Sequence, residues 1–428
     1  MTRALKTAAG QCPGAKYNPR MKYAIVIPDG AADEPQPALG GKTPLHAARL
    51  PNMDRAVAMG VTGLTNNVPK PLTPASDVST LSLFGYDPLQ VYTGRAPLEA
   101  AALGVTLGPG DWAIRCNLVH VADGLMRDFT AGHISSDEGH ALIEALRQKL
   151  AGPIGHGARI EFVPGVSYRN LLIYRAGLKP APFGDKTKTQ PPHDVPDKPV
   201  ADYLPSGPGA DLLAELMERS RYILAGYPVN EARRLARKRD ATQIWLWGQG
   251  RAPTLTKFAD RYGPRGAICS GVDLVRGVGV LLGWDRLDHP AVTDYLDNDY
   301  AKQAELAIAG LQTHDLVCVH VEAPDEASHE GKADAKVEAI ERIDRDIVGP
   351  LLDALPGFGD WRLLIAPDHR TPLRTRAHSY GPVPFAVAGT GVPAGGQTAY
   401  DEDTAASSGR SFDPGWQLMQ WFLGEPAA

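Results

Sequence analysis

The chain has 428 residues, of which 43% are hydrophobic and 22% are charged, a composition typical of globular proteins. This excludes collagen-like, coiled-coil and fully disordered classes, and the length allows two or three domains. Lys and Arg number 44 against 49 Asp and Glu, which gives a formal charge of −5. A balance so close to neutral gives no reason to expect binding to nucleic acid or to an anionic membrane.

The cysteines and the N-terminal residues bear on cellular location. Cys12, Cys116, Cys269 and Cys318 have no CxxC spacing, so neither a zinc knuckle nor a disulfide framework is predicted. No apolar run reaches the ~18–20 residues that a membrane span needs. Residues 1–20 are basic and lack the apolar segment of a secretory signal. We therefore expect a cytoplasmic protein, in which residues 1–20 are either a disordered leader or the result of a mis-assigned start.

Short apolar runs, typical of strands buried on both faces of a parallel sheet, occur towards both ends of the chain. They lie at Lys22–Pro28, Leu316–Val321, Trp361–Ala366 and Pro384–Ala388. Helical patterns occur among them, at Asn52–Met59 and at Lys332–Leu352. Alternation of strand and helix predicts an open α/β sheet.

The middle of the chain has a different pattern. Mixed strands are predicted at Trp112–Val121, Arg159–Val163 and Tyr168–Tyr174, and a capping box at Ser135-x-x-Glu138 begins a helix between the first two. The segment 179–209 is rich in Pro, Asp and Lys, and is either a functional loop or a flexible excursion. We therefore expect an α/β domain at 21–110 and 239–428, interrupted by an inserted α+β domain at 111–238.

Carboxylates and imidazoles follow or flank the predicted strands, where the ligands of open α/β sheets bind. Taken singly, each residue is equally explained as a helix cap, a loop residue or solvated surface. Together they offer three carboxylates and three imidazoles, which suit borderline divalent ions and predict two metal sites. The residues are Asp29, Asp325, His329, Asp368, His369 and His378.

Ser76 is the candidate nucleophile, at the start of a helix predicted to run to Phe84. The shape of the segment alone favours an N-cap serine. A helix start is also where a phosphoryl group can bind, and a metal ion at the Ser76 hydroxyl would make it a nucleophile. Ser79 and Ser82 remain competing serines.

Seven stretches between Met21 and the C-terminus carry a family resemblance: MKYAIVIPDGAAD, LGGKTPLHAARLPNMDRA, PASDVSTLSLFGYDP, YTGRAPLEAAALGV, VHVEAPDEASHEG, KVEAIERIDRDIVGPLL and APDHRTP. In this collinear order they resemble the archaeal-type, 2,3-bisphosphoglycerate-independent phosphoglycerate mutases of the alkaline phosphatase superfamily. The resemblance implies an alkaline-phosphatase-like open sheet with helices on both faces, interrupted by a domain that clamps the substrate.

The resemblance also implies roles for the candidate residues. Asp325, His329 and His378 would hold one divalent ion, and Asp29, Ser76, Asp368 and His369 the other, with Ser76 as the phosphorylated nucleophile. Mn²⁺ is the first expectation; Zn²⁺, Co²⁺ and Mg²⁺ have overlapping ligand preferences, and 2,3-bisphosphoglycerate is not required. The chain departs from the family at Ala75, where glycine is usual, and at Ser79–Thr80, where Ala–Asn is more usual.

Similarity points to substrate contacts as well. His133 resembles a histidine that passes protons to or from the glycerate hydroxyls, and Arg251 resembles an arginine that binds phosphate or carboxylate. Arg115, Arg169 and Arg276 are further candidates, because a planar guanidinium binds both groups in bidentate fashion. Each of these arginines is otherwise explained as a surface residue.

The expected function is an isomerase that interconverts 3-phosphoglycerate and 2-phosphoglycerate through a phosphoserine, with the insert closing to exclude water. A phosphatase or another phosphotransferase, including the proposed homoserine kinase-type relatives, would use the same seven residues. The sequence has no phosphate-binding loop of the GxxxxGK[ST] type, which would have supported the use of ATP. A third hypothesis is a catalytically silent, metal-stabilised binding protein. The expected partner is a small phosphorylated acid, and the oligomeric state stays open.

Overall fold

The computed structural model describes residues 20–424, which form two compact units. Unit 1 ends at Val91 and resumes at Leu255, and unit 2 is Tyr92–Thr254. The expected leader lies outside the described residues, apart from Arg20. Unit 2 is wider than the expected insert at 111–238, because strand β8 (Gln243–Arg251) pairs with β3 (Trp112–Ala122) and helix α5 (Ala96–Ala102) packs on the same sheet.

Unit 1 is built on an eight-stranded sheet with the order β10-β9-β11-β1-β12-β13-β2-β14. The strands from β10 to β12 are parallel, whereas β13 is antiparallel to both of its neighbours. The expectation that the run at 384–388 belongs to the parallel set is therefore wrong, because an apolar run reports burial and not direction. In sheet order the strands are Asp285–Arg286, Gly266–Cys269, Leu316–Val321, Lys22–Pro28, Trp361–Ile365, Val383–Gly389, Val61–Thr65 and Ser411–Phe412.

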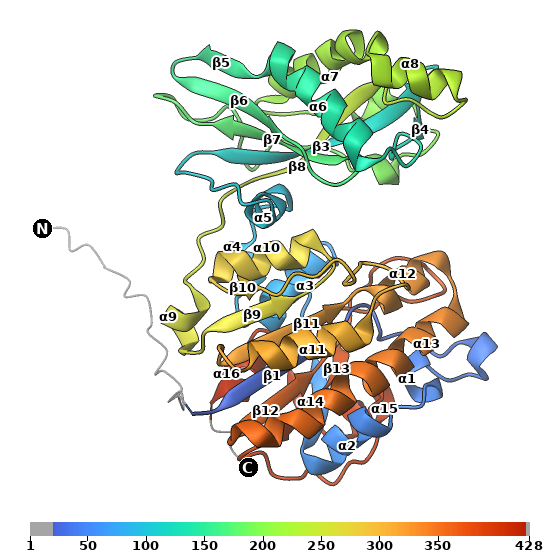
Figure 1. The fold of residues 1–428 in the computed structure, drawn as a ribbon, viewed down its shortest axis with the longest axis vertical. Helices are drawn as coiled ribbons and strands as arrows, with labels where there is room; N and C mark the ends of the chain where they lie inside the picture. Colours follow the sequence, from blue (N-terminus) through green and yellow to red (C-terminus); the bar gives the residue numbers. More distant parts are fainter. Residues whose placement is uncertain (1–19, 425–428) are drawn as a thin grey trace, which may run out of the picture. The chain divides into compact units, whose positions relative to one another are not determined.

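Helices cover both faces of this sheet (Figure 1). On one face of β1, Ala24 and Val26 join a core formed with α2, α11, α13 and α14. On the other face, the ring of Tyr23 packs on Phe422 of α16 at 5.5 Å. The α/β class expected from the sequence is confirmed. The helices are α1 Pro44–Ala47, α2 Pro51–Met59, α3 Ser76–Leu83, α4 Pro88–Val91, α9 Phe258–Tyr262, α10 Asp273–Leu282, α11 Tyr300–Gly310, α12 Ala323–Glu330, α13 Ala333–Ile343, α14 Gly349–Ala354, α15 Glu402–Ser407 and α16 Gln417–Leu423.

The single helix expected at 332–352 is divided. A π-helical segment, Asp344–Val348, separates α13 from α14. Pro350 has no N–H to donate to the preceding turn, so regular α-helical bonding cannot continue through this point. The buried Asp344 carboxylate instead accepts a bond from the N–H of Met53 at 2.6 Å and so fastens the start of α2.

Unit 2 contains an antiparallel sheet of six strands, in the order β4-β3-β7-β6-β5 with β8 also paired to β3. Alternation along β3 sends Ile114 and Cys116 into the core beneath α6 and α7, and Ala113 against α5 on the opposite face. The capping box at Ser135 is present as expected. The remaining elements are β4 Leu125–Asp128, β5 Gly152–Gly155, β6 Ala158–Val163, β7 Arg169–Arg175, α6 Ser136–Leu150, α7 Ala210–Ala225 and α8 Pro228–Leu235.

The long segment 179–209 is packed against β8. The Thr189 hydroxyl donates to the side-chain carbonyl of Gln249 at 2.7 Å, and the Trp245 indole donates to the carbonyl of Gln190 at 2.7 Å. Short 3-10 helices at Pro192–Asp194 and Val200–Tyr203 interrupt it. Within residues 20–424, no helix is both long and apolar enough to span a membrane.

Candidate active site

The candidate ligands meet at one edge of the unit 1 sheet. Strands β1, β11 and β12 end there, and because β13 is antiparallel its beginning lies at the same edge, with Ile365 opposite Ala386. The reversed direction of β13 is therefore what brings in the histidine that precedes that strand. The residues placed at this edge are Asp29 after β1, Asp325 and His329 in α12 after β11, Asp368 and His369 after β12, and His378 before β13.

Asp325, His329 and His378 form the first group. Asp325 and His329 lie one turn apart on α12, and Asp325 Oδ2 is 2.9 Å from His329 Nε2. The same oxygen is 3.4 Å from His378 Nε2, and the two Nε2 atoms are 3.0 Å apart. Three donor atoms thus point at one another, an arrangement that a shared cation would stabilise.

Asp29, Asp368 and His369 form the second group, and all three are fully buried. His369 Nε2 is 3.6 Å from Asp29 Oδ1 and 3.4 Å from Asp368 Oδ2. Ser76 joins this group, with its Oγ 3.3 Å from His369 Nε2. The two groups adjoin, since donor atoms of Asp325, His369 and His378 also lie within 4.8 Å of one another.

Ser76 is the first residue of α3 and is 4% exposed. The N-cap position is occupied by Ala75, so the interpretation of Ser76 as an N-cap serine is wrong, and its hydroxyl faces His369 instead. Ala75 has a φ of −169°, an extended conformation that needs no glycine. Ser79, one of the competing serines, donates to Asp368 Oδ2 at 2.7 Å and so supports a candidate ligand.

The hydrogen bonds of the three histidines fix which ring nitrogen faces the site. In each ring Nδ1 has a partner outside the two groups, which leaves Nε2 directed into them. A histidine binds a metal ion in its neutral form. In the tautomer needed here, Nδ1–H donates to an oxygen and Nε2 keeps its lone pair for the ion. The Nδ1 partners are the Arg376 carbonyl for His329 at 2.9 Å, the Pro74 carbonyl for His378 at 3.3 Å and the Thr371 hydroxyl for His369 at 3.2 Å.

The pKa values of the candidate ligands also indicate that this site favours bound positive charge. Asp29 Oδ1 is buried without a hydrogen-bond partner, and burial together with the charges of Asp368 and Glu322 raises the pKa of Asp29 well above its usual value. Burial opposes the charged form of His329, but the Asp325 carboxylate outweighs it and raises the pKa of His329 to about 9. Protons held at Asp29 and His329 thus stand where positive charge is needed, and two divalent ions could supply that charge in their place.

Two further residues at this edge were not predicted from the sequence. His320, fully buried in β11, bonds Asp29 Oδ2 through Nε2 at 2.8 Å and Ser270 Oγ through Nδ1 at 3.0 Å. Burial lowers the pKa of His320 to about 4, so the ring is neutral and orients Asp29. Glu322 lies beside both residues. A histidine within the apolar run LVCVHV was the available signal.

Unit 2 carries a cluster of guanidinium groups around Arg115. Arg115 is buried, pairs with Glu99 at 2.9 Å and lies over the Trp247 ring at 4.1 Å. Burial lowers the pKa of Arg115 to about 10, and the like charges of Arg95 and Arg169 act in the same direction. Arg169 is exposed at the start of β7. Arg95, which the sequence did not single out, is thus a third cation of this cluster.

The other predicted substrate contacts have different surroundings. Arg251 is exposed at the end of β8, 5.6 Å above the Trp112 ring. His133 is exposed with a φ of 48°, in a loop whose Ala131 carbonyl accepts from the buried Arg233 at 2.7 Å. Arg276 lies on α10 in unit 1 and forms ion pairs with Asp273 at 3.1 Å and Asp288 at 3.5 Å.

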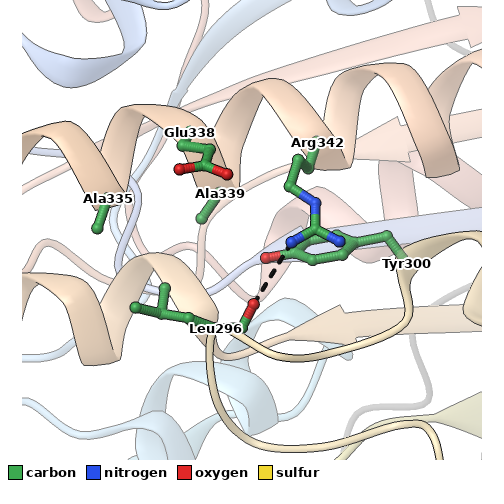
Figure 2. A pocket seen from close by; sticks show the side chains of 6 residues that line it. All are labelled: Leu296, Tyr300, Ala335, Glu338, Ala339 and Arg342. Carbon is green, nitrogen blue, oxygen red and sulfur yellow. Dashed lines mark hydrogen bonds between the residues drawn. The ribbon is translucent and has the colours of Figure 1, made fainter.

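A separate small pocket lies between α11 and α13, and none of the residues of these donor groups lines it (Figure 2). Its only guanidinium belongs to Arg342, which covers the Tyr300 ring at 4.2 Å and donates to the Leu296 carbonyl at 3.4 Å. Glu338 is the one carboxylate that lines it. The pocket therefore offers neither a nucleophile nor a set of metal ligands.

Comparison with known proteins identifies the family. The family model for 2,3-bisphosphoglycerate-independent phosphoglycerate mutase matches residues 58–230. The chain is 46% identical to the mutase of that name from Methanothrix thermoacetophila, over 94% of this chain and 100% of the relative. It is 44% identical to a probable mutase of that name from Geobacter sulfurreducens, again over 94% and 100%.

Solved structures agree with these sequence relatives. The cofactor-independent phosphoglycerate mutase of Thermoplasma acidophilum has a TM-score of 0.64 at 25% identity, and covers 94% of this chain and 100% of its own. A protein of Pyrococcus horikoshii has a TM-score of 0.76 at 27% identity, and covers 94% and 97%. The family and the enzyme class expected from the sequence are confirmed: this chain belongs to the 2,3-bisphosphoglycerate-independent phosphoglycerate mutases.

Proposed function

We propose that this enzyme interconverts 3-phosphoglycerate and 2-phosphoglycerate in the cytoplasm, through a phosphoserine at Ser76. The observation that carries the proposal is the position of the Ser76 hydroxyl, buried and 3.3 Å from His369 Nε2 at the edge where the candidate metal ligands converge. The chain's membership of a mutase family supports the choice of substrate.

Two divalent ions, with Mn²⁺ as our first choice, would be held by the two donor groups. The first group supplies Asp325, His329 and His378, and the second supplies Asp29, Asp368 and His369 together with Ser76. When bound, such ions neutralise the phosphoryl oxygens and lower the pKa of a coordinated hydroxyl. The three buried carboxylates of these groups, Asp29, Asp325 and Asp368, favour such positive charge beside them.

Ser76 supplies the nucleophile. Its Oγ would take the phosphoryl group from one hydroxyl of the glycerate and return it to the other, so that one bond to phosphorus forms as another breaks in line. The N-terminus of α3 favours the negative charge of phosphoserine at this position. His133 would hold the proton that leaves one glycerate hydroxyl and give it to the other.

Unit 2 would bind the glycerate while the phosphoryl group is on Ser76. Arg115 is held in place by Glu99 and Trp247, so its guanidinium is preorganised, and Arg95 and Arg169 add positive charge beside it. Arg251 is a further candidate for the carboxylate. Retaining the glycerate matters because water that reached phosphoserine would turn a mutase into a phosphatase. Arg276 is not part of this proposal, since two aspartates already pair with it.

The test is an enolase-coupled assay with 3-phosphoglycerate and Mn²⁺, without 2,3-bisphosphoglycerate, in which free phosphate is followed in parallel. Ser76→Ala should abolish 2-phosphoglycerate formation, and mass spectrometry of quenched wild-type protein should find phosphate on Ser76. Ser82→Ala is the matched control, because Ser82 is equally buried in the same helix.

Each outcome separates the proposal from its rivals. Metal-dependent isomerisation that is lost in Ser76→Ala and retained in Ser82→Ala supports the mutase. Phosphate release without isomerisation would indicate a phosphatase and overturn the assignment of unit 2. Two bound metal ions with neither reaction would exclude phosphoglycerate as the substrate.

A further inference from the structure

Thr371 contacts both donor groups through a single atom. Its Oγ1 bonds Asp325 Oδ1 in the first group and lies 3.2 Å from His369 Nδ1 in the second. Thr371 is fully buried, so water does not compete for this hydroxyl. Among the hydrogen-bonding groups of residues 20–424 described above, the Thr371 hydroxyl is the one that contacts a candidate ligand of each metal site.

The direction of these hydrogen bonds follows from proton counting. A threonine hydroxyl has one proton to donate, and the Asp325 carboxylate can only accept it. His369 Nδ1 must therefore carry a proton and donate it to Thr371 Oγ1. The chain of bonds runs from His369 Nδ1–H to the Thr371 hydroxyl and on to Asp325 Oδ1, which leaves His369 Nε2 as a lone pair.

The backbone of Thr371 is anchored independently of the site. Its carbonyl accepts from the buried Lys336 Nζ at 3.0 Å, and its N–H donates to the Ala32 carbonyl at 3.2 Å. The space for the Thr371–Asp325 bond exists because residue 30 is glycine. A Cβ on Gly30 would lie 2.4 Å from Asp325 Oδ1 and 2.7 Å from Thr371 Oγ1.

We infer that Thr371 is a positioning residue shared by both metal sites. Its hydroxyl sets the tautomer of His369 and occupies Asp325 Oδ1, so that Asp325 serves the first site through Oδ2 alone. One hydroxyl thus couples the geometry of the two sites, although Thr371 binds neither ion. This inference rests on the metal sites of the proposed function.

The test measures Mn²⁺ binding to full-length protein by titration calorimetry, with stoichiometry from elemental analysis after dialysis. Thr371→Val keeps the shape and removes the hydroxyl, and should weaken both sites, each by about 10–100-fold. Thr371→Ser keeps the hydroxyl and should lose less than about 10-fold at either site, because the outer-shell bond is preserved. Ser79→Ala is the one-site comparison, because Ser79 contacts Asp368 only in the second group.

The outcomes are distinguishable, with thermal unfolding of each variant as the check on folding. Wild-type affinity in Thr371→Val would overturn the inference. Loss in Thr371→Ser with retention in Thr371→Val would also overturn it, since the methyl group would then be what matters. Failure of the wild-type protein to bind two Mn²⁺ per chain would refute the metal sites of the proposed function, and this inference with them. If the wild-type protein binds two Mn²⁺ and Thr371→Val binds them with the same affinity, only the inference is refuted.

Discussion

Replacing Lys336 by methionine should destabilise unit 1 strongly. Lys336 and Asp33 are both fully buried, and Lys336 Nζ is 2.8 Å from Asp33 Oδ2. The variant removes the ammonium and leaves the carboxylate in the interior with N–H partners only, from the Gln36 side chain and from the backbones of Glu34 and Leu373. Breaking one partner of a buried ion pair costs about 3–5 kcal/mol.

The measurement is thermal unfolding of the purified variant in chelator, so that metal binding does not contribute. At about 2–4 °C per kcal/mol for a unit of this size, the expected fall in Tm is about 6–20 °C. Lys332→Met is the matched control, because Lys332 also pairs with a carboxylate at 2.8 Å but its side chain is 56% exposed. An exposed pair is worth about 0–1 kcal/mol, so the control should move Tm by no more than ~4 °C.

A double variant tests the reason for the loss. Asp33→Asn in the Lys336→Met background removes the uncompensated charge, and should recover at least half of the lost stability. If Lys336→Met behaves like Lys332→Met, the pair contributes little and the reasoning from burial is refuted. If the double variant is no more stable than Lys336→Met, the loss comes from packing and not from the charge.

Three further predictions follow from the same structure. Gly30→Ala should prevent the close approach of Asp325 and weaken Mn²⁺ binding, because a Cβ there lies 2.4 Å from Asp325 Oδ1 and the φ of Gly30 is +60°; unchanged binding in calorimetry would contradict this. Mn²⁺ uptake at pH 7.5 should release at least one proton, because the metal-free pKa of His329 is about 9 and the ion displaces that proton. Affinity should therefore rise with pH up to about 9. Calorimetry in buffers of different ionisation enthalpy measures the protons released, and zero release would refute the protonated state of His329. Ser135→Ala removes one half of a capping box and should cost about 1 kcal/mol in the unfolding of unit 2, measured by denaturant titration, whereas no loss would mean that the cap is not stabilising.

The sequence alone determined the parts that depend on short stretches of chain. The apolar runs at 22–28, 316–321 and 361–365 are strands, because a parallel sheet covered by helices buries both faces of each strand. The capping box at Ser135 is a local contact and was readable from its spacing. The motifs identified the family, and with it the candidate residues for the two metal sites.

Only the tertiary structure decided how these pieces are joined. A run of apolar residues carries no information on strand direction, so the antiparallel β13 and the pairing of β8 with β3 could not be predicted. The contacts that shape the site connect distant residues: Ser79 and Asp368 are 289 positions apart, and His320 and Asp29 are 291 apart. The tautomers of the histidines and the role of Thr371 depend on such contacts, because a side chain's hydrogen-bond partner is set by the fold and not by its neighbours in sequence.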